Sequence, residues 1–352
     1  FYCVDADTTL VYPETTHAHA ERHYRLGIIL VNGKEPFPAS RSDYVYSSTM
    51  TYRLNFYDKE DVGEAVFDSA FGVKAFFDEI SYGKANISGV VVDWQDDYGE
   101  SHTADDIRDN RDTYFAEAWS SIDPRQFDAF LLVGLADAGM VQTGWLMSAN
   151  SVPDENGNNL YPKGIVFLVN STFFSTAGET RFDGWLVPSV PWQHELLHSM
   201  GVMGHSQSLW CYPEQSAYDA TASNQDNYAA ANVTLSDWCD LKGYGDPFSL
   251  MGERLWATHP SAASKVEMGW LDEDEGLVSI DASILGSSQI ETTDVLIYPH
   301  AGQDLTKNLA IQVKVPEFTV NTMAGAVLTL DRVTIEYRGA TGLDQYMSAL
   351  GQ

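Results

Sequence analysis

The segment Pro191–His205, with the sequence PWQHELLHSMGVMGH, constrains the fold more than any other part of this chain. Ser189 can cap the N-terminus of a helix, and Pro191 suits its first turn. Gly201 permits the left-handed turn that ends a helix. The segment therefore predicts a helix over residues 190–200, after which the chain reverses.

Four residues of this segment have the types and spacing of a zinc site. His194 and His198 stand four apart, so on a helix their imidazoles lie on one face, one turn apart, where both can bind one zinc ion. Glu195 can reach the position that a metal-bound water takes and remove its proton. After the reversal, His205 can return as a third ligand. We therefore expect zinc held by His194, His198 and His205, with Glu195 as the catalytic base.

The string HELLHSMG, followed by a histidine, resembles the long zinc signature of the metzincin metallopeptidases, HExxHxxGxxH. This chain has one extra residue between Gly201 and His205. Gly204 can accommodate that residue as a bulge, and Glu214 or Asp219 are the alternative third ligands if His205 falls short.

Other segments resemble gametolysin-like and immune-inhibitor-A-like members of the metzincins. Tyr244–Gly252 (YGDPFSLMG) resembles the segment with the metzincin Met-turn, which implies that Met251 lies beneath the zinc as an apolar base. Similar segments are His259–Leu271, Phe77–Gly89 and Ile335–Asp344. The resemblance implies a mixed sheet over a zinc helix, a trailing β-domain and synthesis as a latent precursor.

The hydrophobic pattern predicts an α+β fold for the first part of the chain. Apolar or alternating runs predict strands, and apolar residues at helical spacing predict two long amphipathic helices. Gly83 is expected to stop the first helix. The predicted strands are Tyr24–Val31, Thr49–Tyr57, Ile87–Trp94, Phe127–Leu135 and Gly164–Asn170. The predicted helices are Asp61–Ile80 and Ala104–Ser121.

The texture changes near residue 275. Short strand-like segments follow, separated by Gly, Pro, Asn and Asp, which is typical of a small β-sandwich. We therefore expect a catalytic domain over residues 1–275 and a β-sandwich-like domain over residues 276–352. The strand-like segments are Asp294–Tyr298, Leu309–Val315, Gly325–Leu330 and Arg332–Tyr337.

Charge and hydropathy exclude several classes of partner. The chain has 20 Lys and Arg residues against 50 Asp and Glu residues, for a formal net charge of −30. Such a charge repels phosphate backbones and anionic lipid surfaces, so we expect neither nucleic-acid nor membrane binding. No apolar run of transmembrane length is present. We expect a monomer that meets a protein or glycoprotein substrate.

Cysteine and polar clusters leave some alternatives open. Cys211 and Cys239 flank a polar, loop-like stretch and are expected to form a disulfide in an oxidising compartment, the alternative being unpaired thiols. Cys3 is buried, pairs outside the chain or caps a metal in a latent form. Asp154–Asn159 (DENGNN) is expected to be a plain turn, with structural Ca²⁺ as the alternative. His259 is expected to form a hydrogen bond rather than bind metal.

Together these features lead us to expect a secreted zinc-dependent endopeptidase that cleaves extracellular proteins or glycoproteins. The first alternative is a non-catalytic metzincin-like module for adhesion or glycan binding, although such a module needs no base beside two metal ligands. The second is a zinc hydrolase of cell-wall peptides. Cleavage specificity does not follow from the sequence, because it depends on loops around the metal.

Overall fold

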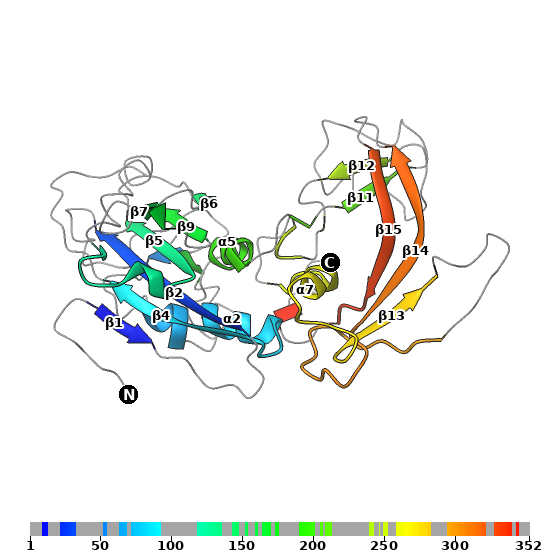
Figure 1. Cartoon of the computed structure of the whole chain (residues 1–352), viewed down its shortest axis with the longest axis horizontal. Coiled ribbons are helices and arrows are strands. Elements are labelled where there is room, and N and C mark those ends of the chain that lie inside the picture. Colours follow the sequence, from blue (N-terminus) through cyan, green and yellow to red (C-terminus); the bar gives the residue numbers. More distant parts are fainter. Residues whose placement is uncertain are drawn as a thin grey trace. The chain divides into compact units, whose positions relative to one another are not determined.

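The chain forms two compact units, Phe1–Val202 and Met203–Gln352, and each is described by itself. The structure is a computed structural model, shown in Figure 1. It describes residues 9–12, 22–32, 52–54, 63–68, 72–92, 118–135, 143–147, 152–153, 159–160, 164–169, 173–175, 190–200, 205–206, 208–212, 239–242, 246, 249–252, 258–282, 294–321, 327–339 and 343–344.

The first unit is built on a six-stranded mixed sheet in the order β1-β4-β2-β5-β9-β6 (Figure 1). The four central strands run parallel, and β1 and β6 pair antiparallel at the two edges. The expected mixed sheet is confirmed, as are four of its predicted strands: β2, β4, β5 and β9. The strands are β1 (Thr9–Tyr12), β2 (Arg22–Asn32), β4 (Ala85–Val92), β5 (Ala129–Leu135), β6 (Thr143–Met147) and β9 (Gly164–Val169).

The centre of this sheet is the core of the unit. Every residue of β4 is buried, and the fully buried side chains of β2 include Leu26, Ile28 and Ile29. Parallel strands covered on both faces have near-continuous apolar sequences, which explains why the apolar runs located them correctly.

The single helix predicted over Asp61–Ile80 is wrong. A one-turn π-helix, η1, spans Glu64–Asp68, and a separate α-helix, α2, spans Val73–Ile80. Gly72 lies between them in an extended conformation (φ −72°, ψ 175°) and is the N-cap of α2. The buried residues of the two segments keep the apolar spacing on which the prediction depended, but this spacing does not register a break in the backbone.

Helix α2 ends as the predicted stop requires. The amide of Gly83 donates to the carbonyl of Asp78 (2.8 Å), and the amide of Tyr82 donates to that of Glu79 (3.2 Å). Both Tyr82 (φ 59°) and Gly83 (φ 78°) are left-handed. These two bonds form the Schellman pattern that satisfies the last carbonyls of a helix.

Long helices are not seen in the part of the chain that the structure describes. Its longest helix is α5, with 11 residues. Only residues 118–121 of the second predicted helix are described, and they include a single helical residue followed by a turn. No helix among the described residues is long and apolar enough to cross a membrane.

Three further pairs of short strands form two-stranded sheets. β3 lies within the predicted strand Thr49–Tyr57, and β7 and β8 flank the predicted polar turn. The residues of that turn between β7 and β8, where Ca²⁺ was the alternative, lie outside the described residues. The pairs are β3 (Tyr52–Leu54) with β10 (Phe173–Ser175), β7 (Val152–Pro153) with β8 (Asn159–Leu160), and β11 (Ser208–Cys211) with β12 (Cys239–Lys242).

The second unit contains a three-stranded sheet, β13-β14-β15, and the short helix α7 (Ala262–Glu267). β13 pairs parallel with β14, and β14 pairs antiparallel with β15. A second sheet facing this one is not among the described residues, so the β-sandwich and the domain boundary near residue 275, which lies inside this unit, stay predictions. The strands are β13 (Leu277–Asp281), β14 (Ala310–Asn321) and β15 (Val327–Glu336).

Two details of the strand prediction in this unit are wrong. Gly325–Leu330 and Arg332–Tyr337 belong mostly to one continuous strand, β15, because Asp331 and Arg332 are exposed strand residues rather than a turn. Asp294–Tyr298 is not a strand: its last residue donates one backbone hydrogen bond to Asn308. Polar residues in an exposed strand cannot be distinguished locally from those of a loop.

Candidate metal centre

Helix α5 spans Val190–Met200, the residues over which the sequence predicted a helix. His194, Glu195 and His198 are all half-buried. The two imidazole rings lie edge to face, with centroids 4.9 Å apart and planes at 83°. The four-residue spacing therefore places both rings together on one side of the helix, as predicted.

The other side of α5 fixes the helix in the first unit. Leu196 and Leu197 are fully buried, and Gln193 and Met200 are nearly so. The helix packs against β9 and β6 of the sheet. Burial of each large apolar side chain contributes about 1.5–3 kcal/mol, so rotation of α5 about its axis would be costly. The direction in which the histidines point is thus set by the core.

The C-terminal end of α5 is held from β2. The Tyr24 hydroxyl donates to the carbonyl of Ser199 (2.5 Å), and the Arg22 guanidinium donates to the carbonyl of Met200 (3.3 Å). Helix-end carbonyls lack partners within the helix, so these two bonds satisfy them. Burial raises the pKa of the Tyr24 phenol to about 12, which keeps it a neutral donor.

His205 completes a group of three. One ring nitrogen from each of His194, His198 and His205 lies within 4.8 Å of the other two, and all three side chains are half-buried. We call these residues the three-histidine cluster. Three converging imidazoles are a donor set that binds a single metal ion in proteins. The cluster could therefore hold a metal ion, and the extra residue after Gly201 does not prevent His205 from joining it.

Met251 lies next to the residue that follows His205. The amide of Ser206 donates to the carbonyl of Met251 (2.7 Å), and the Met251 side chain is fully buried. The hydrogen bond from the amide of Gly252 to the carbonyl of Ser249 (2.9 Å) closes a turn around Met251. The structure thus places a turn at Met251, while the placement of Met251 beneath a metal stays a prediction.

Some predicted alternatives lie outside the described residues. These are the substitute ligands Glu214 and Asp219 and the three alternatives for Cys3.

His259 forms hydrogen bonds, as predicted. Lys265 Nζ lies 2.7 Å from His259 Nδ1, and the amide of His259 donates to the Asp344 carboxylate (3.1 Å). His300 Nε2 lies 3.2 Å from the other oxygen of Asp344. All four side chains are fully buried. We call His259, Lys265, His300 and Asp344 the buried network.

The charges around the buried network keep its imidazoles neutral. Burial, followed by the positive charge of Lys265, lowers the pKa of both His259 and His300 well below the usual value. Burial raises the pKa of Asp344 against the opposing effect of Arg338. Since Lys265 is a donor, His259 Nδ1 is the acceptor in their hydrogen bond. The network joins the start of α7 to residues near the C-terminus.

Sequence reasoning did not find Lys265, His300 or Asp344. His259 and Lys265 are six positions apart, but the other bonded residues are distant in the chain: Lys265 and His300 are 35 positions apart, and His259 and Asp344 are 85 positions apart. No local spacing marks such a group, unlike the four-residue spacing on α5.

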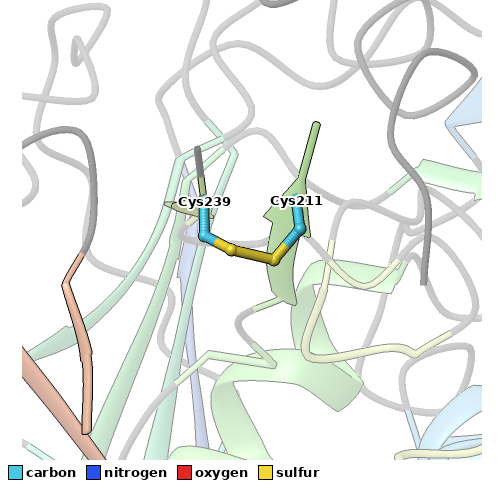
Figure 2. Close-up of a disulfide and its surroundings, with 2 residues drawn as sticks. All are labelled: Cys211 and Cys239. Carbon is cyan, nitrogen blue, oxygen red and sulfur yellow. A yellow bond between two sulfur atoms is a disulfide. The ribbon is translucent and has the colours of Figure 1, made fainter. Parts of the chain in front are cut away.

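The predicted disulfide is confirmed. Cys211 and Cys239 face each other in the antiparallel pair β11–β12 and are joined by a bond between their sulfur atoms (Figure 2). The two residues are 28 apart in sequence. Closing a loop of that length stabilises a fold by about 3–4 kcal/mol in the chain-entropy account. The disulfide closes the strand pair that begins three residues after His205.

Comparisons of the sequence with known proteins gave no match. The chain matches no model of a known protein family, and no curated protein matches its sequence.

Proposed function

We propose that this chain is a zinc-dependent endopeptidase of the metzincin type, similar to the gametolysin-like and immune-inhibitor-A-like enzymes. The observation that carries the proposal is the convergence of His194, His198 and His205 beside Glu195. All four residues are partly accessible, as a centre that must reach a substrate requires. A purely structural cluster of histidines does not need a carboxylate at this position.

Zinc fits this donor set. Three neutral imidazoles leave one position open in a tetrahedral site, which is the arrangement of catalytic rather than structural zinc. Zinc bound there would supply Lewis acidity, which lowers the pKa of a water and polarises a peptide carbonyl. His194 and His198 would hold the ion from a helix fixed by the core, and His205 would hold it from the following segment.

Glu195 is the proposed general base. Its carboxylate accepts the proton of the attacking water and then donates it to the amine that leaves when the peptide bond breaks. Because Glu195 directly follows His194 on α5, the same buried helix face that orients the histidines also orients this carboxylate.

The substrate is proposed to be an extracellular protein or glycoprotein. The disulfide between Cys211 and Cys239 supports an oxidising compartment. The net charge of −30 disfavours polyanionic substrates. A trailing β-domain would give additional contact surface to a large substrate.

Glu195→Gln tests the proposed chemistry, since it keeps the shape of the side chain and removes its basicity. We expect casein cleavage to fall by about 10²–10⁴-fold, the range typical of a lost acid–base group, with zinc content unchanged. The matched control is Glu267→Gln, an exposed carboxylate on α7, which should cleave like the wild type. Full cleavage by Glu195→Gln would exclude the proposed role.

Two alternatives give different results in the same assay. A non-catalytic adhesion or glycan-binding module would bind zinc without cleaving casein or mucin in either form. A cell-wall peptide hydrolase would cleave peptidoglycan but not casein, with the same dependence on Glu195.

A further inference from the structure

Ser249 is a buried polar residue at the turn around Met251. Its side chain is fully buried. Its hydroxyl oxygen lies 2.9 Å from the hydroxyl oxygen of Ser206 and accepts a hydrogen bond from the amide of Met251 (3.2 Å). One hydroxyl therefore links the turn to the residue that directly follows His205.

The backbone of Ser206 is also held on both sides. Its amide donates to the carbonyl of Met251 (2.7 Å), and its carbonyl accepts from the amide of Asp246 (3.1 Å). Ser206 thus has three hydrogen bonds to one short segment, through its amide, its carbonyl and its hydroxyl. A residue fixed in this way leaves its neighbour His205 little freedom of backbone direction.

The turn itself has no room to shift. A Cβ atom added to Gly252 would lie 1.9 Å from the carbonyl oxygen of Asp246 and 3.1 Å from its Cβ atom. The backbones of Gly252 and Asp246 are therefore in direct contact, and this contact requires glycine. This close contact links Asp246 and Gly252, the two ends of the segment to which Ser206 is hydrogen-bonded.

We propose that Ser249 is a positioning residue for the metal: its hydroxyl, through Ser206, holds His205 in the orientation that completes the three-histidine cluster. This inference rests on the proposed function, because it assigns a role to Ser249 in that same centre. Partners that orient a ligand from behind typically change metal affinity by about 10–100-fold when they are lost. His194 and His198 are oriented by the core of their helix, whereas the segment with His205 is linked through Ser206 to the turn around Met251.

Ser249→Ala tests the proposal, with Ser81→Ala as the matched control. Ser81 is also fully buried, and its hydroxyl also accepts a backbone amide, that of Ala85 (2.9 Å). Both variants lose a buried hydroxyl and its bonds, but only Ser249 is linked to a histidine of the cluster. Each protein is stripped of metal, and its zinc affinity is measured by competition with a chelator of known affinity.

We expect Ser249→Ala to bind zinc about 10-fold or more weakly, and Ser81→Ala to bind like the wild type. The visible spectrum of the Co²⁺-substituted protein should change only in Ser249→Ala, because that spectrum reports ligand geometry. A merely structural role would lower the melting temperature of both metal-free variants and leave affinity and spectrum unchanged. That result would overturn the proposal.

Ser206→Ala keeps the proposal falsifiable if Ser249→Ala does not fold. Ser206 is half-buried, and its replacement leaves the backbone bonds in place. We expect a several-fold loss of zinc affinity, and a double variant no weaker than Ser249→Ala alone, because both changes remove one shared bond. Unchanged affinity in Ser206→Ala, or losses that multiply in the double variant, would contradict the proposed link.

Failure of this inference can be told apart from failure of the proposed function. Tight zinc binding by both wild type and Ser249→Ala would remove the role of Ser249 and leave the zinc centre intact. A folded wild type that binds no zinc would overturn both.

Discussion

The three-histidine cluster and the buried network both bring histidines together, yet they differ in every property that decides chemistry. The side chains of the first are half-buried, and their ring nitrogens converge within 4.8 Å. Those of the second are fully buried, and each ring is bonded to a charged neighbour, Lys265 or Asp344. The rings His259 and His300 are 5.3 Å apart at their centroids, a spacing similar to that of His194 and His198.

Proximity of histidines is therefore not what distinguishes a metal centre from a structural one. In the buried network, Lys265 donates a hydrogen bond to His259 Nδ1, so this nitrogen is not available to a metal ion. The positive charge of Lys265 would also repel a cation. In the three-histidine cluster, one ring nitrogen of each histidine lies within 4.8 Å of the other two, and the three side chains are partly accessible. The first arrangement is suited to a structural role, and the second could hold a metal ion.

The largest expected effect comes from His198→Ala in the three-histidine cluster. Removing one of three ligands should lower zinc affinity by at least about 100-fold, beyond the range expected for indirect partners. Since His198 is half-buried, the metal-free variant should melt near the wild-type temperature. Chelator competition and calorimetry check the two halves. A metal-free variant that is strongly destabilised would make His198 structural and remove the contrast with the buried network.

Lys265→Met should lower the stability of the fold and leave zinc binding unchanged, which is the reverse of the result expected for His198→Ala. Removing one partner from a buried charged group typically costs about 3–5 kcal/mol, so we expect a clearly lower midpoint of denaturant unfolding. Zinc stoichiometry of the folded variant should stay unchanged, because Lys265 has no part in the three-histidine cluster. The comparison is broken if this variant keeps its stability or loses its zinc.

Acidification should weaken the buried network. The folded pKa values of His259 and His300 lie well below that of an unfolded histidine, about 6.5. Below pH 6.5 the unfolded chain therefore binds more protons, and each histidine removes up to about 1.4 kcal/mol of stability per pH unit. The raised pKa of Asp344 acts in the opposite sense, since the folded state then retains a proton that the unfolded state has lost.

Unfolding of the metal-free protein, measured from about pH 7.5 to about pH 5, checks this prediction. A free energy of unfolding that stays constant or rises below pH 6.5 would contradict the prediction that the effect of the two buried histidines outweighs the opposing effect of Asp344.

The smallest expected effect is that of Tyr24→Phe. The variant loses one hydrogen bond to the carbonyl of Ser199 at the end of α5, which is worth about 1 kcal/mol. Because the burial of Leu196 and Leu197 still fixes the helix, zinc affinity should change less than in Ser249→Ala. Calorimetry and chelator competition measure both quantities. A larger loss of zinc affinity than in Ser249→Ala would mean that the hydrogen bond from Tyr24 to α5 contributes more to zinc binding than the bond between Ser249 and Ser206.

Much of the first unit could be predicted because its signals are local. The apolar runs of β2, β4, β5 and β9 located the centre of the sheet. The spacing of His194 and His198 placed both rings on one side of α5. The break at Gly72 was missed because apolar spacing continues across it. The continuity of β15 was missed because its exposed residues resemble those of a loop.

The support behind the site could not be predicted in the same way. Ser206 and Ser249 are 43 positions apart, and no local spacing indicates that their hydroxyls lie together. In the buried network, His300 and Asp344 are likewise distant in sequence from the residues that they contact. The sequence thus predicted the proposed metal ligands and catalytic base better than the residues that position them. The spacing of His194 and His198 lies within one helix, whereas Ser206 and Ser249 are far apart in the sequence.

The most direct test of the account is the metal content of the folded wild type, measured by mass spectrometry after equilibration with zinc and removal of the excess. The account predicts about one zinc per chain, retained in Glu195→Gln and lost in His198→Ala, as expected for a three-ligand catalytic site. A folded, zinc-equilibrated chain without bound metal would contradict the central claim, and zinc retained in full by His198→Ala would place the ion elsewhere.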